Sequence, residues 1–146
     1  MLGVLALAGC GSEKLVPYLG KWTGSFEPDS PKSPYRMGCN LQLYATGEKF
    51  RMRVEGPQQA IEVNGTWTIK RQTILLAPRE VKIDDFGGVD LRNPNLPYLP
   101  AEAIQKAFGT ALACRLSRDN KTATSISLNL GPVEGTLQLR KGNLGR

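Results

Sequence analysis

The feature that most constrains the fold is a strict alternation of apolar and polar side chains along residues 49–55. Phe50, Met52 and Val54 lie on one side of this segment, and charged residues occupy every position between and around them. A period of two residues is typical of a β-strand with one buried and one wetted face. Strands of this kind belong to antiparallel sheets. The segment therefore predicts an antiparallel sheet that packs on a core through one face.

Shorter stretches with the same period predict further strands. We expect them over residues 20–26, 39–44, 60–63, 66–70, 73–77, 81–83, 112–117, 125–130 and 135–140. Asn64-Gly65 is a turn or bulge signal between two of them. The alternation places these side chains in the interior: Trp22, Phe26, Leu41, Leu43, Phe50, Met52, Val54, Trp67, Ile69, Leu116, Ile126, Leu128 and Leu139.

Residues 101–108 have the pattern of a helix instead. Pro100 and Glu102 suit the start of a helix, and Ile104 and Phe108 fall four residues apart on one face. Eight or nine short antiparallel strands with one short helix predict an all-β fold. We expect a small up-and-down barrel rather than a sandwich, because short turns join consecutive strands and closure removes exposed strand edges.

The composition argues against several classes of function. The chain has no histidine, which removes imidazole as a base and the usual Ser-His and Cys-His nucleophiles. No nucleophile elbow, phosphate-binding loop or metalloprotease motif is present. We therefore expect no enzyme activity, no metal and no cofactor. The long segment from Asp84 to Pro100 breaks the strand pattern and is the candidate for a functional loop.

The net charge of +6 comes from lysines and arginines that are scattered along the sequence. No basic block and no aromatic-studded basic motif appears, so nucleic acid is not an expected partner. A basic surface could instead favour anionic lipid head groups. The alternative is an ordinary solvated basic face.

Leu7-Ala8-Gly9-Cys10 follows a short apolar run and resembles the lipobox of bacterial lipoproteins. The resemblance implies cleavage before Cys10 and attachment of a lipid to its thiol, so that a membrane is the expected partner. Residues 1–9 are too short to span a bilayer and lack a positively charged start, so we expect a signal peptide that is truncated at its N-terminus. Gly11 follows the cysteine where an inner-membrane retention signal would have Asp. This favours the periplasmic face of the outer membrane.

The other two cysteines, Cys39 and Cys114, then remain as a pair. Both share the inward side of their strands with leucines. An envelope location is oxidising, which favours a disulfide between them. The alternative is two buried free thiols that act as small apolar side chains.

Gly20-Lys21-Trp22 at the start of the first strand resembles the Gly-x-Trp signature of the lipocalins and the wider calycin group. The resemblance implies a barrel that binds a small apolar ligand, with the tryptophan at the barrel floor. In that group an arginine often stacks over the tryptophan, and Arg140 in the last strand is the candidate. Gly20, Trp22 and Arg140 would then close the barrel. The same pattern recurs at Gly65-x-Trp67-Thr68.

Two functions from different classes follow. The first is an envelope lipoprotein whose barrel binds or senses a small apolar ligand through Trp22, Phe26, Phe50, Met52 and Trp67. The second is a non-catalytic lipoprotein with a filled barrel that docks an envelope protein through its loops. In both, residues 1–9 are the signal peptide, 10–19 a lipidated tether and 20–146 the barrel domain.

Overall fold

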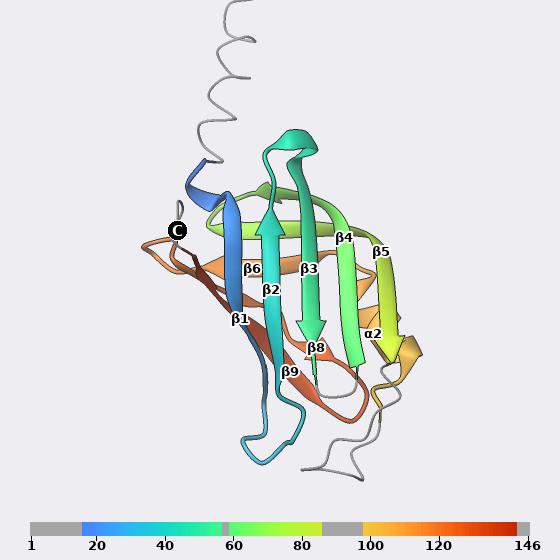
Figure 1. The fold of residues 1–146 in the computed structure, drawn as a ribbon. Coiled ribbons are helices and arrows are strands. Elements are labelled where there is room, and N and C mark those ends of the chain that lie inside the picture. Colours follow the sequence, from blue (N-terminus) through green and yellow to red (C-terminus); the bar gives the residue numbers. More distant parts are fainter. Residues whose placement is uncertain (1–15, 57–58, 86–97, 143–146) are drawn as a thin grey trace, which may run out of the picture.

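The computed structural model describes residues 16–56, 59–85 and 98–142, which form a closed antiparallel β-barrel with one short helix (Figure 1). The elements are η1 (Val16–Tyr18), β1 (Gly20–Pro28), β2 (Met37–Leu43), η2 (Thr46–Glu48), β3 (Lys49–Glu55), β4 (Gln59–Ile69), β5 (Thr73–Asp85), α2 (Ala101–Phe108), β6 (Leu112–Leu116), β7 (Thr122–Ser125), β8 (Leu128–Asn129) and β9 (Glu134–Lys141). The predicted small up-and-down barrel is confirmed. Its ring consists of eight strands, with β8 as a short addition.

Each strand runs antiparallel to its neighbours, and β1 pairs with both β2 and β9. Connections therefore alternate between the two ends of the barrel (Figure 1). One end carries residues 44–48, 70–72 and 117–121, and we call it the tryptophan end because Trp22 and Trp67 lie near it. The other carries residues 29–36, α2 and residues 130–133, and we call it the helix end.

Two glycines lie where neighbouring strands approach too closely for any side chain. A Cβ added to Gly24 would lie 1.7 Å from the backbone oxygen of Gln138, and one added to Gly65 would lie 2.0 Å from that of Ala77. Close backbone approach of this kind marks the tight bends of a barrel.

Strands β4 and β5 are longer than the sequence pattern indicated. Each was expected as two pieces, but both run continuously. Their register shifts between Asn64 and Gly65, where Asn64 opposes Glu80 but Gly65 opposes Pro78. Arg79 is the extra residue of this bulge, which bends the strand pair without ending it. The Asn64-Gly65 signal is therefore a bulge and not a turn.

The strand expected over residues 125–130 is broken, and the interior position assigned to Ile126 is wrong. Ser125 is buried and its hydroxyl accepts a hydrogen bond from the backbone N–H of Leu137 at 2.8 Å. This side chain takes the place of a backbone partner, so β7 ends at Ser125 and pairing with β9 resumes at Leu128. The break shifts the alternation by one residue. Ile126 consequently faces solvent with 49% exposure, while Leu128 is buried.

Apart from Ile126 and the partly buried Ile69, the side chains assigned to the interior are buried in one hydrophobic cluster. Helix α2 has the predicted bounds, and its Ile104 and Phe108 are fully buried in the same cluster. Within the described residues, no helix has the length and apolar character needed to cross a bilayer.

Candidate functional site

The five residues proposed to bind an apolar ligand all lie in the barrel interior. Trp22, Phe26, Phe50, Met52 and Trp67 are at most 2% exposed and belong to one cluster. Alternating strand positions direct them inward, which is why the sequence pattern identified them. The structure therefore brings the predicted set together, in an environment formed almost entirely by apolar side chains.

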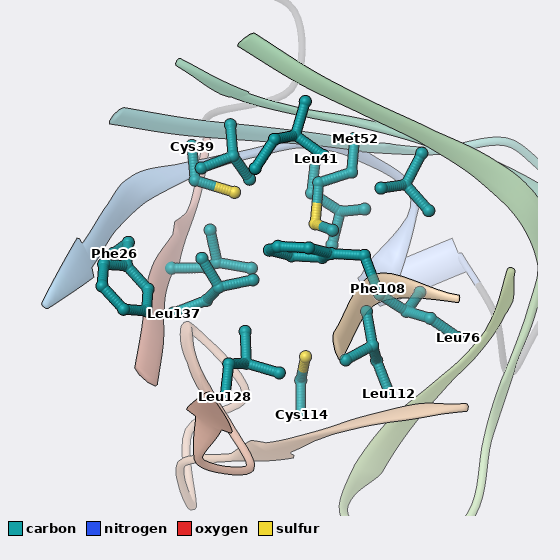
Figure 2. Close-up of a cluster of buried hydrophobic side chains, with 14 of the residues drawn as sticks. Phe26, Cys39, Leu41, Met52, Leu76, Phe108, Leu112, Cys114, Leu128 and Leu137 are labelled. Atoms are coloured by element: carbon teal, nitrogen blue, oxygen red, sulfur yellow. The ribbon is translucent and has the colours of Figure 1, made fainter. Parts of the chain in front are cut away.

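Helix α2 contributes to this interior from the helix end. Phe108 and Ile104 are both 0% exposed. Figure 2 shows the Phe108 ring inside the barrel among strand side chains that include Met52 and Leu112. The protein's own aromatic side chain thus occupies interior space that an apolar ligand would use.

A buried glutamine fixes the segment that leads into α2. The side-chain oxygen of Gln59 accepts a hydrogen bond from the backbone N–H of Leu99 at 2.7 Å, and its amide nitrogen donates to the Leu99 carbonyl at 3.2 Å. The same nitrogen donates to Asp85 at 2.9 Å. Gln59 is only 6% exposed, so these bonds satisfy polar groups that water hardly reaches.

The two tryptophans make matching contacts at the tryptophan end. The indole N–H of Trp22 donates to the carbonyl of Tyr18 at 3.0 Å, and that of Trp67 donates to the carbonyl of Tyr44 at 2.9 Å. Each indole therefore ties a connection at this end to the buried cluster. The two tryptophans of the repeated Gly-x-Trp-Thr pattern therefore make the same kind of contact.

The structure places Arg140 on the outer face of the barrel and not over Trp22. Arg140 is exposed and pairs with the exposed Thr23 across the β1–β9 ladder. Lys141 is the residue directly opposite Trp22, and directly opposite residues share a face of the sheet. Partial burial lowers the pKa of the Lys141 ammonium. Of the closure set, Gly20 and Trp22 lie at the barrel end, and Lys141 rather than Arg140 shares a face of the sheet with Trp22.

The predicted disulfide is also wrong, because Cys39 and Cys114 are buried free thiols. Cys39 lies on β2 and Cys114 on β6, which are separated by β3, β4 and β5 in the ring. Figure 2 shows the two sulfurs on opposite sides of the cluster, with other side chains between them. Inward orientation was inferred correctly, but a disulfide also requires Cα atoms within about 7 Å. Burial raises the pKa of Cys114 to about 12 and raises that of Cys39 as well, so both remain protonated.

Two adjoining hollows lie on the outer face of the barrel, over β1–β5. One has a volume of about 340 Å³ and the other about 680 Å³. They share Tyr44, Arg51 and Asn64 as lining residues. Lys49 and Arg79 join Arg51 around the larger hollow, whose described lining residues include no acidic side chain. This surface attracts anions.

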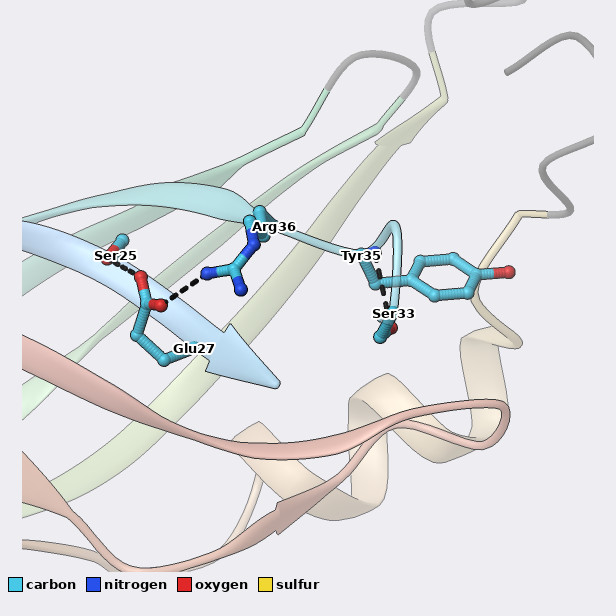
Figure 3. A network of polar contacts seen from close by, with 5 residues as sticks. All are labelled: Ser25, Glu27, Ser33, Tyr35 and Arg36. Carbon is cyan, nitrogen blue, oxygen red and sulfur yellow. Dashed lines mark hydrogen bonds and ion pairs between the residues drawn. The ribbon is translucent and has the colours of Figure 1, made fainter. Parts of the chain in front are cut away.

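A separate polar cluster lies at the helix end, where β1 leads to the loop before β2 (Figure 3). Glu27 accepts hydrogen bonds from the hydroxyl of Ser25 and from Arg36, the latter at 2.5 Å. The hydrogen bond from the Ser25 hydroxyl lowers the pKa of the Glu27 carboxyl; burial opposes this shift, and the Arg36 guanidinium adds to it. The contacts hold the loop of residues 29–36 against the end of β1.

Some sequence-based assignments lie outside the described residues. They are the lipidation site Cys10, the signal peptide of residues 1–9, and most of the candidate loop between Asp84 and Pro100. The sequence pattern did not identify two residues that help to close the barrel ends, Gln59 and Lys141. Gln59 stands just before the apolar residues of its strand, and nothing in the neighbouring sequence indicates its contact with Leu99, forty residues away. Lys141 was accessible to sequence reasoning, because the parity of Leu137 and Leu139 already points residue 141 inward.

Comparisons with known proteins leave the family open. No protein-family model and no curated protein matches the chain. Among solved structures, the chain is similar to the crystal structure of Rv2717c from M. tuberculosis, with 11% identical residues and a TM-score of 0.40. The alignment covers 91% of this chain and 98% of that one.

Proposed function

We propose that this protein is a non-catalytic, lipid-anchored interaction module of the bacterial envelope, in which the barrel is a packed scaffold. The observation that carries the proposal is the complete burial of Ile104 and Phe108 from α2 in the same cluster as the strand side chains. A side chain the size of phenylalanine leaves little room for a ligand in an eight-stranded barrel, whose interior is only just wide enough for its own side chains. Recognition is therefore assigned to the outer surface and the loops.

The anchor rests on the lipobox-like Leu7-Ala8-Gly9-Cys10 and on its spacing from the barrel. Five residues lie between Cys10 and Val16, so the six residue steps that join them span at most about 20 Å. A lipid on Cys10 would hold the tryptophan end near the bilayer, with the outer membrane as the proposed location. The loops of the helix end would face away from the membrane and remain accessible to an envelope protein.

Binding of a small apolar ligand inside the barrel is the second candidate. The observation that favours it is the apolar lining formed by Trp22, Phe26, Phe50, Met52 and Trp67, which carries no charge. In this case Phe108 must move aside when the ligand enters.

Native mass spectrometry of the protein purified from a bacterial envelope distinguishes the two candidates. A packed scaffold should have the mass of the polypeptide plus the lipid on Cys10, with no further adduct. A small molecule that is lost on denaturation would overturn the packed scaffold in favour of the ligand-binding barrel. Peptide mass analysis of the same sample tests the anchor, because an unmodified Cys10 would contradict it.

A further inference from the structure

The charges of the described residues are separated along the barrel axis. Each end comprises its connections, the segments where the chain enters or leaves the barrel, and the three strand residues next to each of these. The tryptophan end contains ten basic and two acidic residues, a net charge of +8, whereas the helix end contains four basic and seven acidic residues, a net charge of −3. The ten cations are Lys21, Lys49, Arg51, Lys70, Arg71, Arg115, Arg118, Lys121, Arg140 and Lys141. The modest net charge of the whole chain hides this separation.

The cations of the tryptophan end are not used in ion pairs within the described part of the barrel. The four ion pairs found there join Arg36 to Glu27, Arg53 to Glu55 and to Glu62, and Lys82 to Glu80. All of these lie at the helix end or in the middle of the barrel. One of the two acids at the tryptophan end, Asp119, accepts hydrogen bonds from the Ser117 hydroxyl and the Lys121 backbone N–H. Like charges gathered without acidic partners repel one another, which an anionic partner would relieve.

The place where the chain enters the barrel indicates which anionic partner this is. Val16–Tyr18 lies at the tryptophan end, and the indole of Trp22 is bonded to it. The short distance from Cys10 brings the same end close to a bilayer if Cys10 carries a lipid. Basic residues are attracted to anionic lipid head groups only within about a Debye length of the surface, roughly 8–10 Å. The anchor would hold the cations near that range.

We infer that the tryptophan end is a docking surface for the anionic head groups of a phospholipid bilayer, and that it orients the barrel with its helix end away from the membrane. This inference rests on the proposed membrane anchor for its biological setting. The attraction to anionic head groups comes from the ten cations, so it does not require a lipid on Cys10. The larger hollow, which is lined by Lys49, Arg51 and Arg79, lies beside the same end and gives phosphate groups a concave cationic surface.

The test uses the full chain with Cys10→Ser, which removes the lipid, and vesicles of phosphatidylcholine with or without phosphatidylglycerol. We expect sedimentation with the phosphatidylglycerol vesicles that weakens steeply from 50 to 500 mM salt. The triple variant Lys49→Gln, Arg51→Gln and Lys121→Gln should lower the partition coefficient on the order of 100-fold, because each cation near the surface contributes about fivefold.

A matched control removes the same charge elsewhere, through Lys32→Gln, Lys82→Gln and Lys106→Gln. This variant should lose less than about threefold in binding, although its net charge is identical. Equal losses in both triple variants would mean that net charge alone drives binding, and would overturn the docking surface. Equal binding of the parent protein to both vesicle types would overturn it too. Circular dichroism of each variant checks that the barrel is retained.

Crosslinking in the envelope separates lipid from a protein partner. A photoreactive amino acid at position 49 or 121 of the complete, lipid-modified protein should form adducts with phospholipid. Adducts with a protein alone would overturn the inference while leaving the proposed interaction module intact. An unmodified Cys10 would remove the anchor but leave the vesicle result unchanged, so the two proposals fail separately.

Discussion

The two ends of the barrel are closed by different means. At the tryptophan end the strands close the barrel themselves, through Trp22 and Trp67, whose indoles donate to carbonyls of nearby connections. At the helix end a separate element does so, since α2 inserts Ile104 and Phe108 and depends on Gln59 for its attachment.

The difference lies in which elements carry the closing side chains. At the tryptophan end these side chains belong to the strands, so this end forms whenever the strands pair. At the helix end they belong to α2, which needs the additional attachment between Gln59 and Leu99. We therefore expect the helix end to open first and the tryptophan end to open only with the whole barrel.

The largest effect is expected from Phe108→Ala. Removing a fully buried phenylalanine leaves a cavity, and the free energy of unfolding should fall by about 3–5 kcal/mol. Denaturant unfolding of the full chain measures the loss. Hydrogen exchange should show faster exchange at Ile104 than at Tyr44, whose N–H is bonded to Lys49 at the other end. Equal acceleration at both positions would contradict the independence of the two ends.

Gln59→Leu should cost less, about 2–3 kcal/mol. The substitution keeps the volume but leaves the N–H and the carbonyl of Leu99 without their side-chain partner. Limited proteolysis before α2 and denaturant unfolding both report the change. Protease resistance equal to that of the parent protein would show that α2 is held by its apolar face alone.

Replacing either tryptophan by phenylalanine tests whether the two have equivalent roles. Trp22→Phe and Trp67→Phe each remove one indole N–H and some buried volume, and each should destabilise the protein by about 1–2 kcal/mol. Chemical denaturation compares them directly. A difference greater than about 2 kcal/mol between the two variants would show that one tryptophan dominates the closure.

Ile126→Ala should change the free energy of unfolding by less than about 0.5 kcal/mol, because Ile126 faces solvent. Leu128→Ala is the matched control, and its buried side chain should cost about 2–5 kcal/mol. Denaturant titration of both variants measures their unfolding midpoints, and the midpoint of Leu128→Ala should fall much further than that of Ile126→Ala. A large loss for Ile126→Ala would place that residue back in the core and contradict the break after Ser125.

Reducing agent should have no effect on thermal unfolding of the mature protein. Cys39 and Cys114 are free thiols on strands that are not neighbours in the ring, so there is no disulfide between them to reduce. A thiol reagent should modify both only after denaturation, because burial protects them and keeps them protonated. A fall in the unfolding temperature on reduction would instead restore the disulfide.

The fold was predictable from the sequence because its signals are local. Residues 49–55 alternate without a fault, and the helix at residues 101–108 carries its own start signals in Pro100 and Glu102. The break after Ser125 was not predictable, since a serine hydroxyl replacing a backbone partner leaves the apolar pattern of Ile126 and Leu128 unchanged.

The candidate sites divide in the same way. Inward orientation of the five interior residues follows from strand parity alone. The separation of charge does not, because cations scattered in sequence gather at one end only when alternate connections meet there. The false disulfide has the same origin, as parity gives the direction of a side chain but not the distance across the barrel.

The pairing of β1 with β9 has a consequence for how the chain reaches this structure. The first strand finds its second partner only among residues 135–141, so the ring stays open until nearly all of the domain is present. Until then β1 exposes a row of unpaired backbone groups that can join strands of other molecules. A fold with such distant partners is expected to form slowly. We expect that a chaperone which shields this edge until the ring closes would raise the yield of folded protein.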